Sequence, residues 1–231
     1  YLGGKFAQEK LLTITEEDYE KGETRRELVE QMGGLGFFGC LAPEKYGGTG
    51  MGYLAAVVIA EEIAKINASY CGYFICQQAG PPLTILNHGT DEQRMQFVPD
   101  MISGKHLALF AATEPDAGSD VAAMRALAIK KGNKYVLNGV KTWITNATTA
   151  DIGIFWVYTN KDKQHKGMSC FIVDMKTEGI STKKINKMGL RCQDAGEVVL
   201  NEVVVPEENI LGKPGEGYSI LMSTLGNTRL F

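Results

Sequence analysis

Small and hydroxyl-bearing residues gather in the stretch 110–120, directly after a short apolar run. The run has the length and apolar content of a buried strand, and Pro115 and Gly118 prevent its regular continuation, so the backbone must turn there. A turn that carries Thr113, Gly118 and Ser119 offers backbone N–H groups and hydroxyls with no bulky side chain between them and a ligand. We therefore predict a loop that binds a flat heterocycle or a pyrophosphate.

A second stretch, 141–147, supplies a large aromatic face and another hydroxyl, on Trp143 and Thr145. In a strand, residues i and i+2 point to the same face, so we expect these two side chains to face one object. Simpler interpretations stay open at this point. Tryptophan alone is more often a core residue, and Thr113 and Ser119 could hydrogen-bond their own turn.

Composition excludes several classes of function. The chain has 231 residues, 44% of them hydrophobic, and a formal net charge of −3, which suits a sizeable core and argues against nucleic-acid binding. Five cysteines are scattered without a C-x-x-C pair and three histidines are isolated, so we predict reduced thiols and no metal site. No apolar run reaches the ~18 residues needed to cross a bilayer. The chain opens at Tyr1 without a methionine, so we expect a trimmed start.

Helices are predicted to position these residues from the N-terminal side. We expect one helix with Thr15 as its N-cap, ending by Gly33–Gly34, and another over 54–66. The order Thr90-Asp91-Glu92-Gln93 predicts a capping box at the start of a further helix. The glycine-rich stretch 47–52 does not have the G-x-G-x-x-G spacing, which makes a nicotinamide dehydrogenase a distant alternative.

The hydrophobic period changes once, near residue 105. Beyond it, short β-branched and aromatic runs separated by turn residues indicate an antiparallel barrel or sandwich, with Asn138–Gly139 as a turn between two of its strands. The predicted fold class is therefore α+β. An all-α domain is expected over 1–105, a β domain over 106–211, and the first helix of a further helical domain over 212–231.

Three blocks carry a family resemblance. T-E-P-x-A-G-S-D at 113–120 and K-x-W-I-T-N at 141–146 resemble the flavin-binding signature of the acyl-CoA dehydrogenases, and residues 186–212 resemble the strand pair that closes their middle domain. The resemblance points to the medium- and short-chain or glutaryl-like branch and covers essentially the whole chain. It implies the N-terminal and middle domains plus the first helix of the C-terminal domain. Family members usually have a branched aliphatic residue at the position of Ala112.

The resemblance implies FAD-dependent oxidation of an acyl-CoA thioester. A carboxylate removes the α proton while the β hydrogen leaves as hydride to flavin N5, which forms a trans-2-enoyl-CoA, and an electron-transfer flavoprotein takes the electrons. Carried over by position, Thr113 would bond the pyrimidine edge, Trp143 would pack against the ring and Thr145 would bond N5. The full expected set for the flavin is Phe110, Ala112, Thr113, Gly118, Ser119, Trp143, Ile144 and Thr145. Ser119 and Arg229 would contact the CoA substrate.

The resemblance also indicates which acids are not the base. Glu114 and Asp120 could converge as a carboxylate pair, but in the family they bond the loop backbone. The isovaleryl and long-chain branch places its catalytic Glu immediately before an Arg in the last helix, and here that position is Thr228. The base is therefore expected beyond Phe231. Glutaryl-specific relatives have an Arg at the position of Cys71, so an apolar acyl group is favoured.

Two other functions remain possible for a protein with this fold. One is an acyl-CoA oxidase that returns electrons to O₂, and the other is a non-catalytic scaffold that kept the fold. The resemblance further implies a homo-oligomer, with a tetramer as the expectation. The expected location is the cytoplasm, or the mitochondrial matrix if a transit peptide has been removed.

Overall fold

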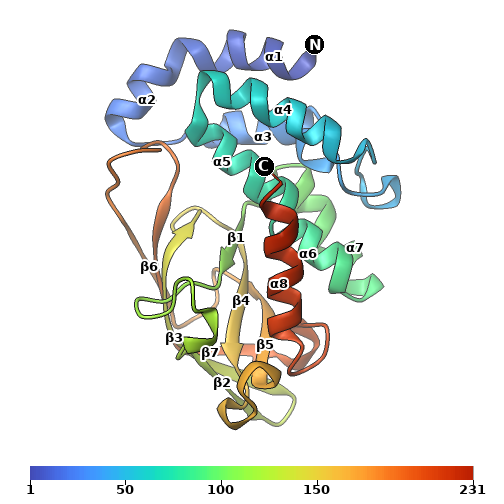
Figure 1. The fold of residues 1–231 in the computed structure, drawn as a ribbon, viewed down its shortest axis with the longest axis vertical. Helices are drawn as coiled ribbons and strands as arrows, with labels where there is room; N and C mark the ends of the chain where they lie inside the picture. Colours follow the sequence, from blue (N-terminus) through green and yellow to red (C-terminus); the bar gives the residue numbers. More distant parts are fainter. Residues whose placement is uncertain (231) are drawn as a thin grey trace.

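The chain forms a helical region stacked end to end on a β-sheet (Figure 1). The structure is a computed structural model and describes residues 1–230. Short 3-10 turns and one π-helical turn join the helices of the first region. These helices are α1 (Leu2–Phe6), α2 (Thr15–Lys21), α3 (Arg26–Gly34), α4 (Gly52–Ile66), α5 (Ala68–Ala79), α6 (Pro81–His88) and α7 (Asp91–Ile102).

The helix expected over 15–34 is two helices, α2 and α3, separated by a turn. Gly22 ends α2 in the left-handed conformation, with φ 67°, which glycine adopts without a steric penalty. Thr15 is the first residue of α2 and not its N-cap, and its hydroxyl donates to the carbonyl of Leu11 at 2.7 Å. The prediction of one helix was wrong because a glycine C-cap lies within the stretch. The helix over 54–66 and the capping box at Thr90 are confirmed.

The second region is a single eight-stranded sheet in the described part of the chain. The strand order is β6-β7-β3-β2-β4-β5-β8, with β1 beside β4. β4 pairs in parallel with β1 and β2, and the remaining pairs are antiparallel, so the α+β class is confirmed. The strands are β1 (Ala108–Ala111), β2 (Leu127–Lys131), β3 (Lys134–Thr145), β4 (Ile152–Tyr158), β5 (Met168–Asp174), β6 (Ile180–Lys184), β7 (Ala195–Pro206) and β8 (Ile210–Leu211).

The turn predicted at Asn138–Gly139 is a bulge inside the long strand β3. The register against β7 shifts between Leu137 and Gly139. The Asn138 side chain donates to Glu202 at 2.6 Å and accepts from the Glu202 amide at 2.9 Å. The prediction of two strands was wrong because an Asn-Gly pair can serve a bulge as well as a hairpin turn.

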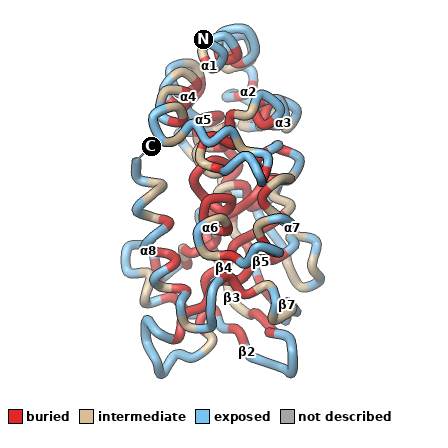
Figure 2. The backbone as a smooth tube through the Cα atoms, turned by 90° about the vertical axis from the view of Figure 1, so that its right-hand side faces the viewer, coloured by how far each residue is buried: buried red, intermediate tan, exposed pale blue. Residues whose placement is uncertain are grey.

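Two hydrophobic cores meet at the sheet. Alternate residues of β4 divide between them, since successive side chains of a strand point to opposite faces. Ile154 and Trp156 pack in the core shared with the helices, whereas Phe155 and Val157 pack in the core enclosed by the sheet. Buried residues run without interruption from the helices into the sheet (Figure 2). The two regions therefore share a core and are not joined only by a linker.

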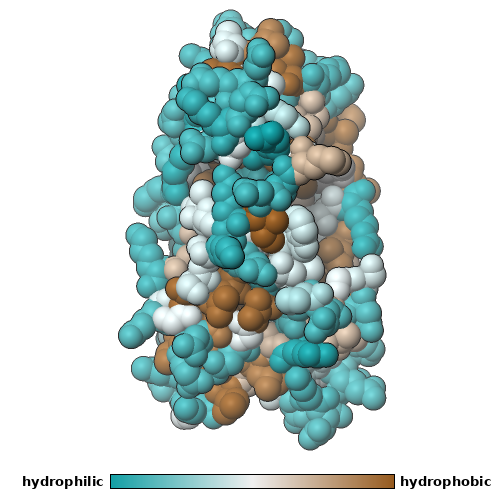
Figure 3. All heavy atoms as spheres, turned by 90° about the vertical axis from the view of Figure 1, so that its left-hand side faces the viewer, coloured by the Kyte–Doolittle hydropathy of each residue, from teal (hydrophilic) through white to brown (hydrophobic). Residues whose placement is uncertain are grey.

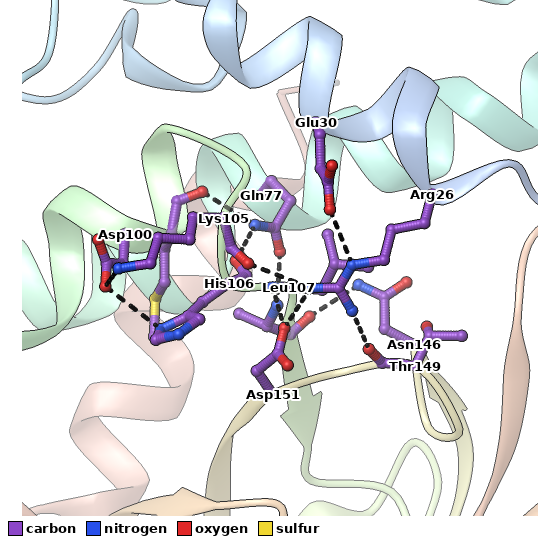
Figure 4. A network of polar contacts seen from close by, with 12 residues as sticks. Arg26, Glu30, Gln77, Asp100, Lys105, His106, Leu107, Asn146, Thr149 and Asp151 are labelled. Carbon is purple, nitrogen blue, oxygen red and sulfur yellow. Dashed lines mark hydrogen bonds and ion pairs between the residues drawn. The ribbon is translucent and has the colours of Figure 1, made fainter.

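A polar network fixes the start of β1 against the helices (Figure 4). Arg26 on α3 pairs with Asp151 at 2.7 Å. The same Asp151 oxygen accepts from the amide of Leu107 at 2.9 Å, and the side-chain oxygen of Gln77 on α5 accepts from the amide of Ala108 at 2.7 Å. The strand that leads into the predicted binding loop is thus held from both sides.

The last helix, α8 (Gly217–Thr228), lies along the sheet and reaches the helical region (Figure 1). The indole of Trp156 donates from Nε1 to the carbonyl of Gly217 at 2.9 Å, which fixes the start of α8. Further along, the hydroxyls of Thr84 on α6 and Thr224 on α8 lie 3.0 Å apart. Within residues 1–230, no helix combines the length and apolar character that spanning a bilayer requires.

Candidate binding cleft beside α8

A cavity of about 410 Å³ opens between the loop that follows β1 and the helix α8. One wall comes from 110–122 and the other from α8, with His165 from the loop between β4 and β5. The lining residues are Phe110, Ala112, Thr113, Gly118, Ser119, Asp120, Val121, Ala122, His165, Tyr218, Leu221, Met222, Leu225 and Arg229. Segments far apart in sequence therefore form one cleft.

Six of the nine predicted site residues line this cavity, and Trp143, Ile144 and Thr145 do not. Ile144 is buried in the core enclosed by the sheet. Thr145 is half-buried at the end of β3, and Trp143 is 60% exposed. The face on the left of Figure 1 is mostly hydrophilic, with hydrophobic side chains at its top and middle as well as in its lower part (Figure 3).

The two predicted stretches nevertheless meet. The amide of Thr142 donates to the carbonyl of Thr113 at 3.0 Å, so the residue before Trp143 is bonded to the wall of the cavity. Three hydroxyls nearby, on Thr113, Ser119 and Thr145, make no hydrogen bond with any of residues 1–230. They are available to a ligand that lies between the stretches.

Beneath this contact lies a buried ion pair. Lys141 is fully buried and Glu114 is 5% exposed, with Nζ and Oε1 2.8 Å apart. Nζ also donates to the carbonyls of Ala112 at 3.1 Å and Trp156 at 2.6 Å. Burial lowers the pKa of Lys141, and the carboxylate of Glu114 opposes that shift. Three acceptors around Nζ suit an ammonium, which has three N–H donors.

The two acids of the loop bond its backbone, as expected. Glu114 accepts from the amides of Arg125 at 2.5 Å and Ala126 at 3.1 Å. Asp120 accepts from the amide of Ala122 at 3.2 Å. Glu114 is therefore fully committed to structure, whereas Asp120 lines the cavity with one carboxylate oxygen used.

Trp143 has a left-handed backbone, with φ 57°. It sits where the register of β3 against β7 shifts, between Lys141 and Ile144. For a bulky residue this conformation is strained by roughly 1–3 kcal/mol, and such strain clusters at ligand sites. The bulge turns the indole outward from the sheet and leaves its face open.

Sequence reasoning missed His165 and the face of α8 that lines the cleft, with Tyr218, Leu221, Met222 and Leu225. The ring of Phe110 lies 4.3 Å from that of the buried Trp156, and the ring of His165 lies 4.3 Å from that of Tyr218. Residues 218, 221, 222 and 225 of α8 are spaced so that they lie on one face of the helix. That spacing is visible in the sequence and could have indicated that they share one surface. Nothing in the sequence around His165 indicates that it reaches the cleft.

The residues present fit a flat cofactor with an anionic tail. A Cβ built on Gly118 would meet nothing within 4 Å, so the backbone there faces open space. Free hydroxyls, an exposed indole and apolar α8 side chains can cover a ring system, and Arg229 can pair with an anion. Among the described residues, no group of three or more His, Cys, Asp or Glu could hold a metal ion.

Comparison with known proteins identifies relatives along the whole chain. Residues 4–105 match the model of the acyl-CoA dehydrogenase N-terminal domain, and residues 109–203 match that of the acyl-CoA dehydrogenase middle domain. Glutaryl-CoA dehydrogenase of Desulfococcus multivorans is 42% identical over 97% of the chain. The chain spans 59% of the length of that relative.

Solved structures agree with the sequence relatives. Butyryl-CoA dehydrogenase from Megasphaera elsdenii is 35% identical, with a TM-score of 0.96 over 99% of this chain and 61% of its own. A glutaryl-CoA dehydrogenase from Mycobacterium smegmatis, solved in complex with FADH2, is 29% identical, with a TM-score of 0.92 over 98% of this chain and 57% of its own. The likeness therefore covers both the helical region and the sheet.

Proposed function

The chain belongs to the acyl-CoA dehydrogenase family, covering its N-terminal and middle domains, and on that premise we propose that the protein oxidises an acyl-CoA thioester to a trans-2-enoyl-CoA. The observation that carries the proposal is the contact between Thr142 and Thr113, because it joins the two signature stretches at the wall of one cavity. The proposed domains are 1–105, 106–211 and the start of a further domain at 212.

We assign the flavin site to both stretches. Thr113 and Thr145 would donate or accept hydrogen bonds at the ring edges through hydroxyls that have no partner among residues 1–230. Trp143 would cover one face of the ring, and Gly118 would let the backbone approach the pyrophosphate. When bound, FAD supplies the acceptor for the hydride that leaves the substrate. Phe110 and Ala112 would complete the wall by packing, and Ile144 would support it from the core enclosed by the sheet.

The substrate is proposed to lie along α8. Leu221, Met222 and Leu225 give that wall of the cavity an apolar surface, and Arg229 at its end suits an anionic part of CoA. Ser119 would contact both the cofactor and the thioester arm. We propose an apolar acyl group because Cys71, which stands where glutaryl-specific relatives have an arginine, is buried in the shared core and carries no charge.

No carboxylate that lines the cavity is assigned as the base. Asp120 already accepts from a backbone amide, and Glu114 is paired with Lys141. Thr228 has no acidic group to remove a proton. The base is proposed to be a carboxylate outside the described residues. The electron acceptor is proposed to be an electron-transfer flavoprotein, and the working form a homo-oligomer.

The test uses the full-length protein, purified and titrated with FAD. We expect a flavin absorption spectrum that is bleached anaerobically by butyryl-CoA and much less by glutaryl-CoA. Reoxidation by electron-transfer flavoprotein with little O₂ consumption would exclude an oxidase. Ser119→Val should weaken bleaching, whereas the matched variant Ser181→Val on β6, away from the cleft, should not. A colourless protein that takes up no FAD would contradict the proposal.

A further inference from the structure

The ion pair between Lys141 and Glu114 has no part in the proposed chemistry, yet it lies directly under the site. A buried ion pair is weak evidence for stability, because well-packed apolar residues often do as well in its place. In some proteins such a pair instead fixes one arrangement among several.

The ammonium of Lys141 joins three segments that reach the cleft. It bonds the carbonyl of Ala112 where β1 ends, the carboxylate of Glu114 in the binding loop and the carbonyl of Trp156 on β4. The ring of Trp156 in turn contacts Phe110 in the cavity wall. The Lys141 side chain thus fixes the first signature stretch from its buried side.

The same residue shapes the second stretch. Lys141 and Thr142 are both buried, at 0% and 8%, although consecutive residues of a regular strand point to opposite faces. The register shift between Lys141 and Ile144 accommodates both, and within it Trp143 takes its left-handed backbone. The same bulge therefore accommodates the buried side chain of Lys141 and the exposed side chain of Trp143.

We propose that Lys141 is a positioning residue that sets the stretch 142–145, which carries Trp143 and Thr145, against the loop 112–114, with Glu114 as its counter-charge. The proposal rests on the proposed function, since it concerns the same flavin site. Lys141 is fully buried and does not line the cavity. It acts through Thr113, Thr142 and Trp143, whose relative placement it holds.

The experiment measures FAD affinity and thermal stability separately in full-length Lys141→Met. We expect FAD affinity to fall at least ~10-fold, which corresponds to the loss of about one charge-assisted hydrogen bond in the positioning of the site. The visible circular dichroism of the remaining bound FAD should also change, because the indole no longer has a fixed place. The matched control is Leu137→Ala, a buried residue of the same strand that makes none of these contacts. It should lower the melting temperature and leave FAD affinity within ~2-fold.

A second variant separates positioning from folding. Lys141→Met combined with Glu114→Gln leaves no unpaired buried charge, so it should recover most of the melting temperature. FAD affinity that stays low in this double variant supports the proposal. Wild-type affinity and an unchanged flavin spectrum in either variant overturn it and leave the proposed function intact. If the wild-type protein itself binds no FAD, both fail.

Discussion

The amide of Thr142 donates a hydrogen bond of 3.0 Å to the carbonyl of Thr113, and this contact brings the two signature stretches together. Thr113 lines the cavity together with Ser119, and Trp143, the residue after Thr142, has an exposed indole. The contact involves only backbone atoms, so it depends on the path of both chains and not on the side chains.

Gly118 is expected to tolerate a side chain in the protein without ligand. A Cβ there meets nothing within 4 Å, so Gly118→Val should change the free energy of unfolding by no more than about 0.5 kcal/mol. The added methyls would enter the cavity, and FAD affinity should fall at least ~10-fold. Calorimetry without FAD and a fluorescence titration with FAD measure the two effects. Gly189→Val, also in open space but outside the cavity, should alter neither, and an equal loss of affinity there would contradict the prediction.

Trp143 is expected to cost stability in the absence of its ligand. Asparagine tolerates a left-handed backbone better than tryptophan does, so Trp143→Asn should raise the free energy of unfolding of the FAD-free protein by about 1 kcal/mol. FAD affinity should fall, because the aromatic face is lost. Urea denaturation gives the first quantity. Trp143→Phe keeps an aromatic ring and the strained backbone, so its stability should match that of wild type. If Trp143→Asn is less stable than Trp143→Phe, the strain does not exist.

Arg26 is expected to hold the helices onto the sheet. Arg26→Met removes the ion pair with Asp151 together with the bonds to the carbonyls of Lys105 and Thr149, and should cost about 1–3 kcal/mol of unfolding free energy. Arg125→Met is a matched control, because its pair with Asp116 is largely exposed and worth about 0–1 kcal/mol. Urea midpoints at low and high salt compare the two. Equal, small losses of unfolding free energy in both variants would show that the network in Figure 4 does not stabilise the packing of the helices on the sheet.

His88 is expected to make the fold sensitive to acid. Its Nε2 is buried without a partner among residues 1–230, and burial lowers its pKa below the ordinary 6.5, with Glu216 opposing that shift. The unfolded chain then binds a proton more readily than the folded one, so stability is present above the ordinary pKa and is lost as pH falls through and below 6.5. Urea midpoints at about pH 8 and about pH 5 measure this loss. Between the two pH values, His88→Leu should lose less unfolding free energy than wild type does. An unchanged pH dependence in the variant would rule this out.

Much of the fold could be predicted because its signals are local. The change from helical to strand period near residue 105 and the capping box at Thr90 both lie within a few residues of chain. The errors were local too, but each depended on a competing use of the same residues. Gly22 ended a helix inside an expected one, and Asn138–Gly139 formed a bulge in place of a turn.

The candidate site also has a part that local sequence patterns predicted and a part that only the folded structure revealed. Sequence alone determined the loop at 110–120 and the stretch at 141–147, because their residue types and spacing are visible without any partner. Only the tertiary structure placed α8 and His165 opposite that loop, since no local pattern states which distant segment forms the second wall. It also decided that Lys141, a residue type that strands usually expose, is fully buried. The reason is physical: an ammonium can leave water only where a carboxylate and carbonyl oxygens from other segments converge on it, and that convergence belongs to the folded chain.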